Sequence, residues 1–234
     1  VQNALFDAVF SDDLISIKKL LKKRGDDINV NAVNEHGAIP LVIASQNGKV
    51  DTVKVLIKAG GNVNQAIMLG TSPLHAASQF GHVATVKVLI KAGGNINQVR
   101  TMDGASPLWM ASFNGDVATV KVLIEAGVIV NQARTMDGCS PLYIASSRGE
   151  IRSSESIDLV KVLIKAGGNI NQATDDGCSP LYAASNNGHL ATAKVLIEAG
   201  GNVNQLKTTD GSTPLLIASQ KGHTDIVAIL LGTP

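Results

Sequence analysis

The chain has 234 residues, of which 44% are hydrophobic, only 3% are aromatic and 17% are charged. So few aromatic side chains predict a thin, aliphatic core. Twenty basic and nineteen acidic side chains give a net charge of +1, which argues against a nucleic-acid binder. No apolar run approaches the roughly 20 residues that span a bilayer, and no signal-like segment opens the chain. Two cysteines are too few for a secreted disulfide framework. We therefore expect no membrane association and an intracellular location, cytoplasmic or nuclear.

A repeat of about 34 residues runs through the sequence. Its register is marked by Pro40, Pro73, Pro107, Pro141, Pro180 and Pro214, at spacings of 33, 34, 34, 39 and 34 residues. A degenerate unit precedes the first proline, so we count an N-terminal cap, five internal repeats and a C-terminal cap. Their approximate bounds are 1–34, 35–67, 68–101, 102–135, 136–174, 175–208 and 209–234. We expect the seven units to form a single domain.

One unit shows the local structure that the repeat predicts. Ser72 is an N-cap residue before a proline at the first helical position, which predicts a short helix over Pro73–Phe80. Aliphatic residues at helical spacing predict a second helix, roughly Ala84–Ala92, and a hairpin-like excursion fills Asn95–Gly104. Two such short helices cannot bury their apolar faces alone, so neighbouring units must stack. The sequence therefore predicts an all-α repeat solenoid.

The repeated motif resembles the signature of the ankyrin repeat family over nearly the whole chain. It reads SPLHAA at 72–77, SPLWMA at 106–111, SPLYIA at 140–145, SPLYAA at 179–184 and TPLLIA at 213–218, while the first internal repeat departs with IPLVIA at 39–44. The resemblance implies stacked helix–turn–helix pairs with β-hairpin-like finger loops. It also implies binding of proteins through a concave groove formed by the finger loops and the first helix of each pair.

The histidines and cysteines recur at equivalent positions of different repeats, which argues against a role in catalysis. His82, His189 and His223 occupy one Gly-His position of different repeats, which is typical of structural residues at the turn between helices. Cys139 and Cys178 hold equivalent positions in adjacent units, about 10 Å apart, too far for a disulfide and without a nearby histidine for zinc. No phosphate-binding glycine motif is present. We expect no enzyme activity, no metal and no cofactor.

Aromatic residues favour a binding face on the first helices. Trp109 and Phe113 are four residues apart and share a helix face, as expected of an interface anchor. Trp109, Tyr143 and Tyr182 occupy equivalent slots, which predicts a row along the groove. The alternative is that this slot is half-buried between repeats and has only a structural role. Phe80 and Arg148 stand at the variable ends of first helices.

The finger loops add apolar and basic residues. Met68 and Leu69 form an apolar pair at a finger tip, and the segment Arg100–Asp103 recurs identically at Arg134–Asp137. Methionine suits adaptable binding surfaces and arginine is enriched in interface cores. Asp103, Asp137, Asp176 and Asp210 each precede a glycine and are interpreted as turn formers. The predicted partner-binding residues are Met68, Leu69, Phe80, Arg100, Met102, Trp109, Phe113, Arg134, Met136, Tyr143, Arg148 and Tyr182.

Two other surfaces compete with that face. One is a basic ridge along the second helices, which we interpret as solvated and which comprises Lys54, Lys87, Lys121, Lys161 and Lys194. The other is an insertion at 150–159, expected to be a tolerated surface loop, a second contact site, or a loop phosphorylated at Ser153, Ser154 and Ser156. We predict a monomeric, non-enzymatic module that binds a protein or peptide. The alternatives are a structural spacer or scaffold segment of a larger repeat-containing protein, or an engineered binding scaffold.

Overall fold

The computed structural model describes the backbone of residues 2–22, 28–148 and 153–232, and their side chains except those of 153–156. Within these residues it has fourteen α-helices, one short 3-10 helix and no strand. The chain divides into two compact units, residues 1–102 (unit 1) and 103–234 (unit 2). The all-α repeat fold is confirmed in each.

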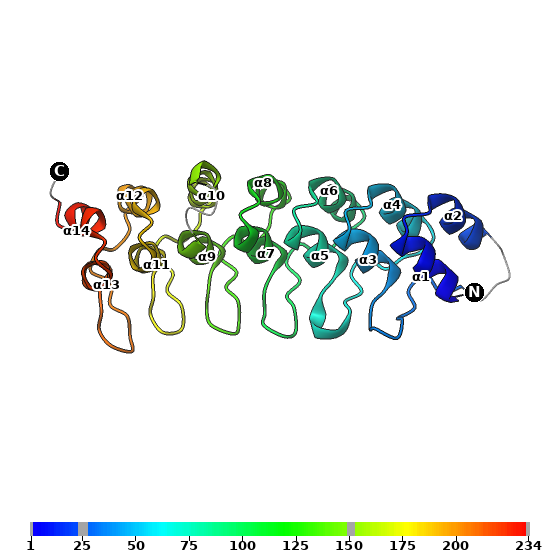
Figure 1. Ribbon diagram of the computed structural model, residues 1–234, viewed down its shortest axis with the longest axis horizontal. Helices are drawn as coiled ribbons and strands as arrows, with labels where there is room; N and C mark the ends of the chain where they lie inside the picture. The colour runs from blue at the N-terminus through cyan, green and yellow to red at the C-terminus, as the bar shows by residue number, and fades with distance from the viewer. Residues whose placement is uncertain (1, 23–27, 149–152, 233–234) are drawn as a thin grey trace. The chain divides into compact units, whose positions relative to one another are not determined.

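Unit 1 stacks three helix pairs. Its elements are α1 (Gln2–Phe10), α2 (Leu14–Lys22), α3 (Pro40–Gln46), α4 (Val50–Lys58), η1 (Met68–Gly70), α5 (Pro73–Gln79) and α6 (Val83–Lys91). The first helices α1, α3 and α5 pack on one another in order, and so do the second helices α2, α4 and α6. The two rows form two layers, with the fingers projecting beyond the first-helix layer (Figure 1).

Unit 2 repeats this arrangement with four pairs. Its elements are α7 (Pro107–Asn114), α8 (Val117–Glu125), α9 (Pro141–Arg148), α10 (Ser153–Lys165), α11 (Pro180–Asn187), α12 (Leu190–Glu198), α13 (Pro214–Lys221) and α14 (Thr224–Leu230). Each first helix packs on its own second helix and on the first helix of the next pair.

The first helices begin at the predicted caps. In α5 the Ser72 hydroxyl accepts the backbone N–H of His75, and the His75 ring bonds back to the backbone N–H of Ser72. Ser106, Ser179 and Thr213 cap α7, α11 and α13 through the same contact. Each such cap contributes about 1 kcal/mol. The helix bounds differ slightly from the predicted ones, since α5 ends at Gln79, α6 spans Val83–Lys91 and Phe80 is a C-cap residue.

Leucine fills the core of every internal pair. At least one leucine of each internal second helix is fully buried, at Leu56 and Leu89 in unit 1 and at Leu123, Leu159, Leu163 and Leu196 in unit 2. Burying such a side chain contributes about 1.5–3 kcal/mol. The core is mainly aliphatic, as predicted, with Phe6, Trp109 and Tyr182 as buried aromatic exceptions.

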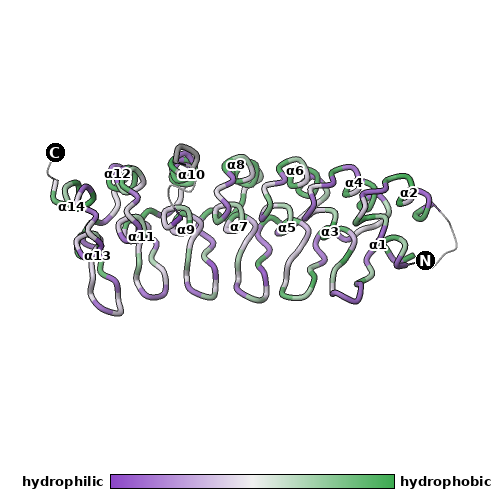
Figure 2. Tube along the Cα trace, in the orientation of Figure 1, coloured by the Kyte–Doolittle hydropathy of each residue, from purple (hydrophilic) through white to green (hydrophobic). Residues whose placement is uncertain are grey.

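The fingers are hairpin-like without forming a sheet. Backbone hydrogen bonds close them, from Ile67 N to Thr71 O at 3.0 Å in unit 1 and from Arg134 N to Cys139 O at 2.9 Å in unit 2. Successive fingers are also joined, by Met102 N to Leu69 O at 3.2 Å and by Met136 N to Asp103 O at 3.1 Å. The fingers carry both hydrophilic and hydrophobic residues, whereas hydrophobic residues gather in the helices (Figure 2).

The insertion corrects one expectation. Residues 150–159 were expected to form a loop, yet α10 begins at Ser153 and has 13 residues, against 9 in α8 and in α12. Much of the excess therefore lengthens the second helix at its N-terminal end. Residues 150–152 of this expectation lie outside the described residues.

Candidate functional site

The histidines hold the scaffold together. The Nε2 atoms of His82, His189 and His223 lie 2.9, 3.2 and 3.2 Å from backbone carbonyls of the preceding repeat. His75 is fully buried within its capping box. These contacts occupy the rings, and they confirm the structural interpretation.

The cysteines are unpaired and buried. Burial raises the pKa of the Cys139 thiol to about 12 and that of Cys178 to about 11, with smaller contributions from nearby aspartates. Both thiols are therefore protonated at neutral pH, which makes them weak nucleophiles. Among the described residues no group of three or more His, Cys, Asp or Glu side chains is arranged to hold a metal ion.

The predicted aromatic row exists, and most of it lies beneath the surface. Trp109, Tyr143 and Tyr182 occupy equivalent places, because the backbone N–H of each donates to its N-cap serine. Trp109 is only 3% exposed and Tyr182 only 8%, while Tyr143 is half-buried. Burial also raises the pKa of Tyr143. Trp109 and Tyr182 thus support the face from below instead of forming its outer surface.

Two arginines and two aromatic rings of unit 2 form one continuous stack. The guanidinium of Arg134 lies 4.4 Å from the centroid of the Trp109 ring. That ring stacks on Phe113 with a centroid distance of 5.3 Å and an angle of 17°. The guanidinium of Arg148 lies 3.9 Å from the Phe113 centroid. We call these four residues the Arg–aromatic stack. It runs from a finger loop to the C-terminal ends of α7 and α9.

The two arginines of the stack differ in their charge partners. Arg134 Nε donates to Asp137 Oδ1 at 3.0 Å, and its Nη2 donates to Oδ2 of the same carboxylate. This pairing raises the pKa of Arg134 and lowers that of Asp137. Within the described part of the chain Arg148 has no ion pair or hydrogen bond that would neutralise its guanidinium.

The aspartates at the finger tips are turn formers, as predicted. The backbone N–H groups of Ala105, Cys139 and Ser212 donate to the carboxylates of Asp103, Asp137 and Asp210 respectively. Asp176 accepts the Thr174 hydroxyl instead.

The predicted finger-tip residues are mostly exposed. Met68, Leu69 and Met102 are exposed on unit 1, as is Phe80 beside α5, and Met136 is 72% exposed on unit 2. Arg100 is partly buried. Exposed Val33 and Leu206 also lie on fingers and were not among the predicted residues. Aligning every finger, instead of only the two identical ones, would have found them.

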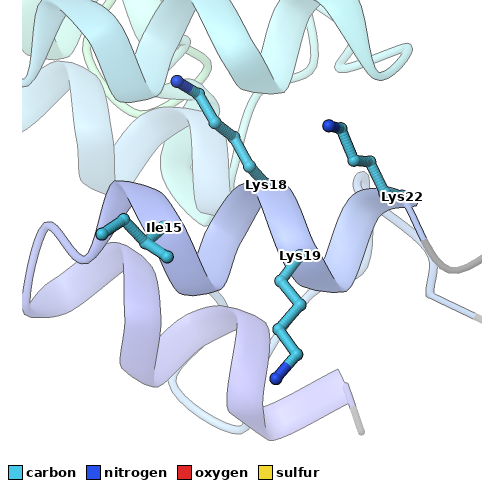
Figure 3. A pocket seen from close by; sticks show the side chains of 4 residues that line it. All are labelled: Ile15, Lys18, Lys19 and Lys22. Atoms are coloured by element: carbon cyan, nitrogen blue, oxygen red, sulfur yellow. The ribbon is translucent and has the colours of Figure 1, made fainter.

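The competing surfaces are polar. Lys54 pairs with Asp51 at 3.0 Å, and the other four lysines of the ridge are exposed along second helices. On the cap helix α2, Lys18, Lys19 and Lys22 lie on one face beside the exposed Ile15 (Figure 3). This matches the polar outer face expected of a cap.

Stacked helix pairs with capped first helices and projecting fingers define a helical repeat protein. Family models for ankyrin repeats match residues 5–100 and 150–233 in groups of three copies, and a single-repeat model matches residues 103–135. The chain belongs to the ankyrin repeat family.

Solved structures support the same fold. The ankyrin repeat domain of Bcl-3, a member of the IkappaB protein family, matches with a TM-score of 0.82 at 22% identity, over 96% of this chain and 97% of that one. The human ASB11 ankyrin repeat domain matches with a TM-score of 0.82 at 25% identity, over 98% of each chain. No curated protein matches the sequence.

Ankyrin repeats generally mediate protein–protein interaction, so the family supports the predicted class of function. Among the helices in the described ranges, none is both long enough and apolar enough to cross a membrane.

Proposed function

We propose that this chain is a non-enzymatic, monomeric module that binds a protein or peptide. We place the binding site of unit 2 on helices α7 and α9 and the finger at 133–139, and we call this surface the α7–α9 face. The predicted finger residues of unit 1, which are Met68, Leu69, Arg100 and Met102 with Phe80, form a second contact region on that unit. The unpaired, buried cysteines fit a reducing intracellular compartment.

The observation that carries the proposal is that exposed large apolar side chains recur on the fingers, although others, such as Ile15 on the second helix α2, lie elsewhere. Val33, Met68, Leu69 and Met102 are on fingers of unit 1, and Met136 and Leu206 are on fingers of unit 2. In the same units the outward positions of the second helices carry the lysine ridge. Exposed apolar side chains that gather on one surface are typical of an interaction site.

The Arg–aromatic stack holds several side chains of the α7–α9 face in fixed positions. Phe113 and Ile144 pack, partly buried, against Ala105, Trp109 and Met110. Side chains fixed in this way lose little conformational entropy when a partner binds. Arginine and aromatic residues are also the side chains most often responsible for interface affinity.

A structural spacer would carry no preferred face. The exposed methionine at position 136 argues against that alternative, and so does the guanidinium of Arg148, which pairs with no acidic side chain in the part of the chain that the structure describes. A protein partner would satisfy both.

The test compares two variants of equal charge change. Asn114→Glu/Met136→Glu alters two exposed residues of the α7–α9 face, and Lys121→Glu alters one exposed residue of α8. Each lowers the net charge by two, so nonspecific electrostatic effects are matched. Wild type and both variants are used to capture proteins from extract of the cells that make the chain, with captured amounts measured by quantitative mass spectrometry.

We expect a specific partner that wild type and Lys121→Glu retain equally and that the face variant loses. Matching urea unfolding curves establish that all three proteins are folded. A partner lost from Lys121→Glu and kept by the face variant would contradict the proposal, as would the absence of any partner with all three.

A further inference from the structure

One end of the Arg–aromatic stack carries a positive charge that no described residue compensates. Asp137 neutralises Arg134 through two hydrogen bonds, whereas Arg148 at the end of α9 has no ionic partner in the described ranges. The polar side chains at the equivalent ends of α7, α9 and α11 are uncharged, at Asn114, Ser147, Asn186 and Asn187. Counting the described residues alone, the stack therefore presents a single net cation.

The stacking fixes how this cation is presented. The guanidinium of Arg148 lies 3.9 Å from the centroid of the Phe113 ring, within the range of a cation–π contact. Phe113 is itself held by stacking on the buried Trp109. A guanidinium placed against a ring keeps N–H groups available at its edge, and their fork matches the two oxygens of a carboxylate. Arg148 is thus ordered before any ligand arrives.

An apolar surface adjoins the cation. Phe113 and Ile144 are partly buried hydrophobic residues of one cluster, and Phe113 is the residue that Arg148 covers. A ligand that reaches Arg148 therefore also meets apolar surface.

Resting on the proposed function, we infer that Arg148 is the specificity-determining residue of the α7–α9 face, and that the face takes an acidic peptide segment whose Asp or Glu side chain lies next to an apolar one. The carboxylate forms a bidentate pair with Arg148, and the apolar neighbour packs beside Phe113 and Ile144. A phosphorylated segment fits less well, because phosphate carries nearly two negative charges and is usually bound by clusters of arginines. Here Asp137 already occupies the second arginine.

The probe is a phage-displayed library of random peptides, selected separately on immobilised wild type and on Arg148→Gln. We expect the peptides selected on wild type to share an Asp or Glu beside an apolar residue. This preference is absent from the peptides selected on the variant. An equal acidic preference on both proteins, or no preference on wild type, would overturn the inference.

A synthetic peptide from the selection then gives a double-mutant cycle. Arg148→Gln, or replacing the acidic residue of the peptide by its amide, weakens binding about tenfold, the size of a lost charged hydrogen bond. The second change adds little once the first is made, because both remove the same pair. Arg148→Lys recovers only part of the affinity, since an ammonium lacks the fork. Independent, additive losses would refute the pairing.

Two controls separate this inference from the proposed function. Lys121→Glu reports on general electrostatics, and the peptide binds it within about twofold of wild type. Asn114→Glu/Met136→Glu reports on the face itself. A peptide that binds this variant as well as wild type lies elsewhere, which would contradict the proposed function. If the peptide does not bind this variant but binds Arg148→Gln as tightly as wild type, the α7–α9 face remains the binding site and the role of Arg148 is refuted.

Discussion

The guanidinium of Arg134 lies 4.4 Å from the centroid of the Trp109 ring, and it covers an indole that is 97% buried. The same guanidinium is held by Asp137, so one finger residue joins a turn, an ion pair and the aromatic core of α7. Arg148 forms a similar ring contact, and no ion pair to it is found within residues 2–22, 28–148 and 153–232. The two arginines of the stack are therefore expected to differ in what they contribute.

Arg134→Gln should destabilise the protein, and Arg148→Gln should not. Removing Arg134 leaves Asp137 without its cation and uncovers Trp109, which together cost about 1–2 kcal/mol for this partly buried pair. Removing Arg148, which is partly buried but has no ion pair among the described residues, costs at most about 0.5 kcal/mol for its lost ring contact. Urea unfolding of the two variants beside wild type measures the difference, and equal losses would contradict it.

Two glycines allow the cost of a strained backbone conformation to be measured apart from the cost of a steric clash. Gly104 and Gly115 have φ of 74° and 77°, so alanine is strained at either position. A Cβ on Gly104 would lie 2.6 Å from the Thr135 backbone nitrogen, whereas a Cβ on Gly115 meets nothing within 4 Å. We expect Gly115→Ala to cost about 1 kcal/mol and Gly104→Ala at least about 2 kcal/mol. Thermal unfolding measures both, and equal costs would show that the finger yields to the new side chain.

Leu69 is strained at the tip of its finger. Its φ is 72°, a conformation that costs a non-glycine residue about 1–2 kcal/mol. Leu69→Gly is expected to raise the free energy of unfolding by about 0.5–1 kcal/mol, since the relief of strain exceeds the entropy that glycine adds to the unfolded chain. Met68→Gly, at the neighbouring exposed residue without a positive φ, is expected to give no such gain. A loss of stability in Leu69→Gly would show that its side chain has structural contacts.

Because the thiols are buried, we expect the protein to become less stable at alkaline pH. The pKa of Cys139 is raised from 9.0 to about 12 and that of Cys178 to about 11, so the folded state favours the protonated thiols. Their contribution to stability is fully present below the unfolded pKa of about 9 and is lost as the pH rises toward the folded values. We expect the urea midpoint of wild type to fall between about pH 9 and pH 11, and to fall less in Cys139→Ala/Cys178→Ala.

The same burial governs thiol reactivity. In the native protein at neutral pH, a thiol reagent should modify Cys139 and Cys178 only slowly, and urea should make both react at once. Fast reaction of the folded protein would show that one of these sites opens.

Local patterns were enough to predict the repeat and its caps. A serine followed by proline, as at Ser72 and Pro73, predicts the start of a helix. The buried position of Leu89 follows from the helical spacing of the apolar residues. The depth of Trp109 could not be predicted in this way, because the slot it shares with Tyr143 is defined by sequence register, and burial there depends on the neighbouring repeat.

Contacts between neighbouring repeats were also not predicted from the local sequence patterns. Arg148 follows Phe113 by 35 residues, about one repeat, so the pair belongs to adjacent first helices. A search for pairs one repeat apart would have found this contact. The helical start of the insertion was also missed, although Ile157 stands three residues before Val160 and continues the apolar spacing of α10.

We propose above all that the α7–α9 face contacts a protein partner. The most direct measurement places a photo-crosslinking amino acid at Met136 on that face and, in a separate protein, at Lys121 on α8, both exposed. After irradiation in extract, we expect a discrete crosslinked protein from position 136 and none from position 121. A partner crosslinked from position 121 alone, or from neither position, would contradict the account.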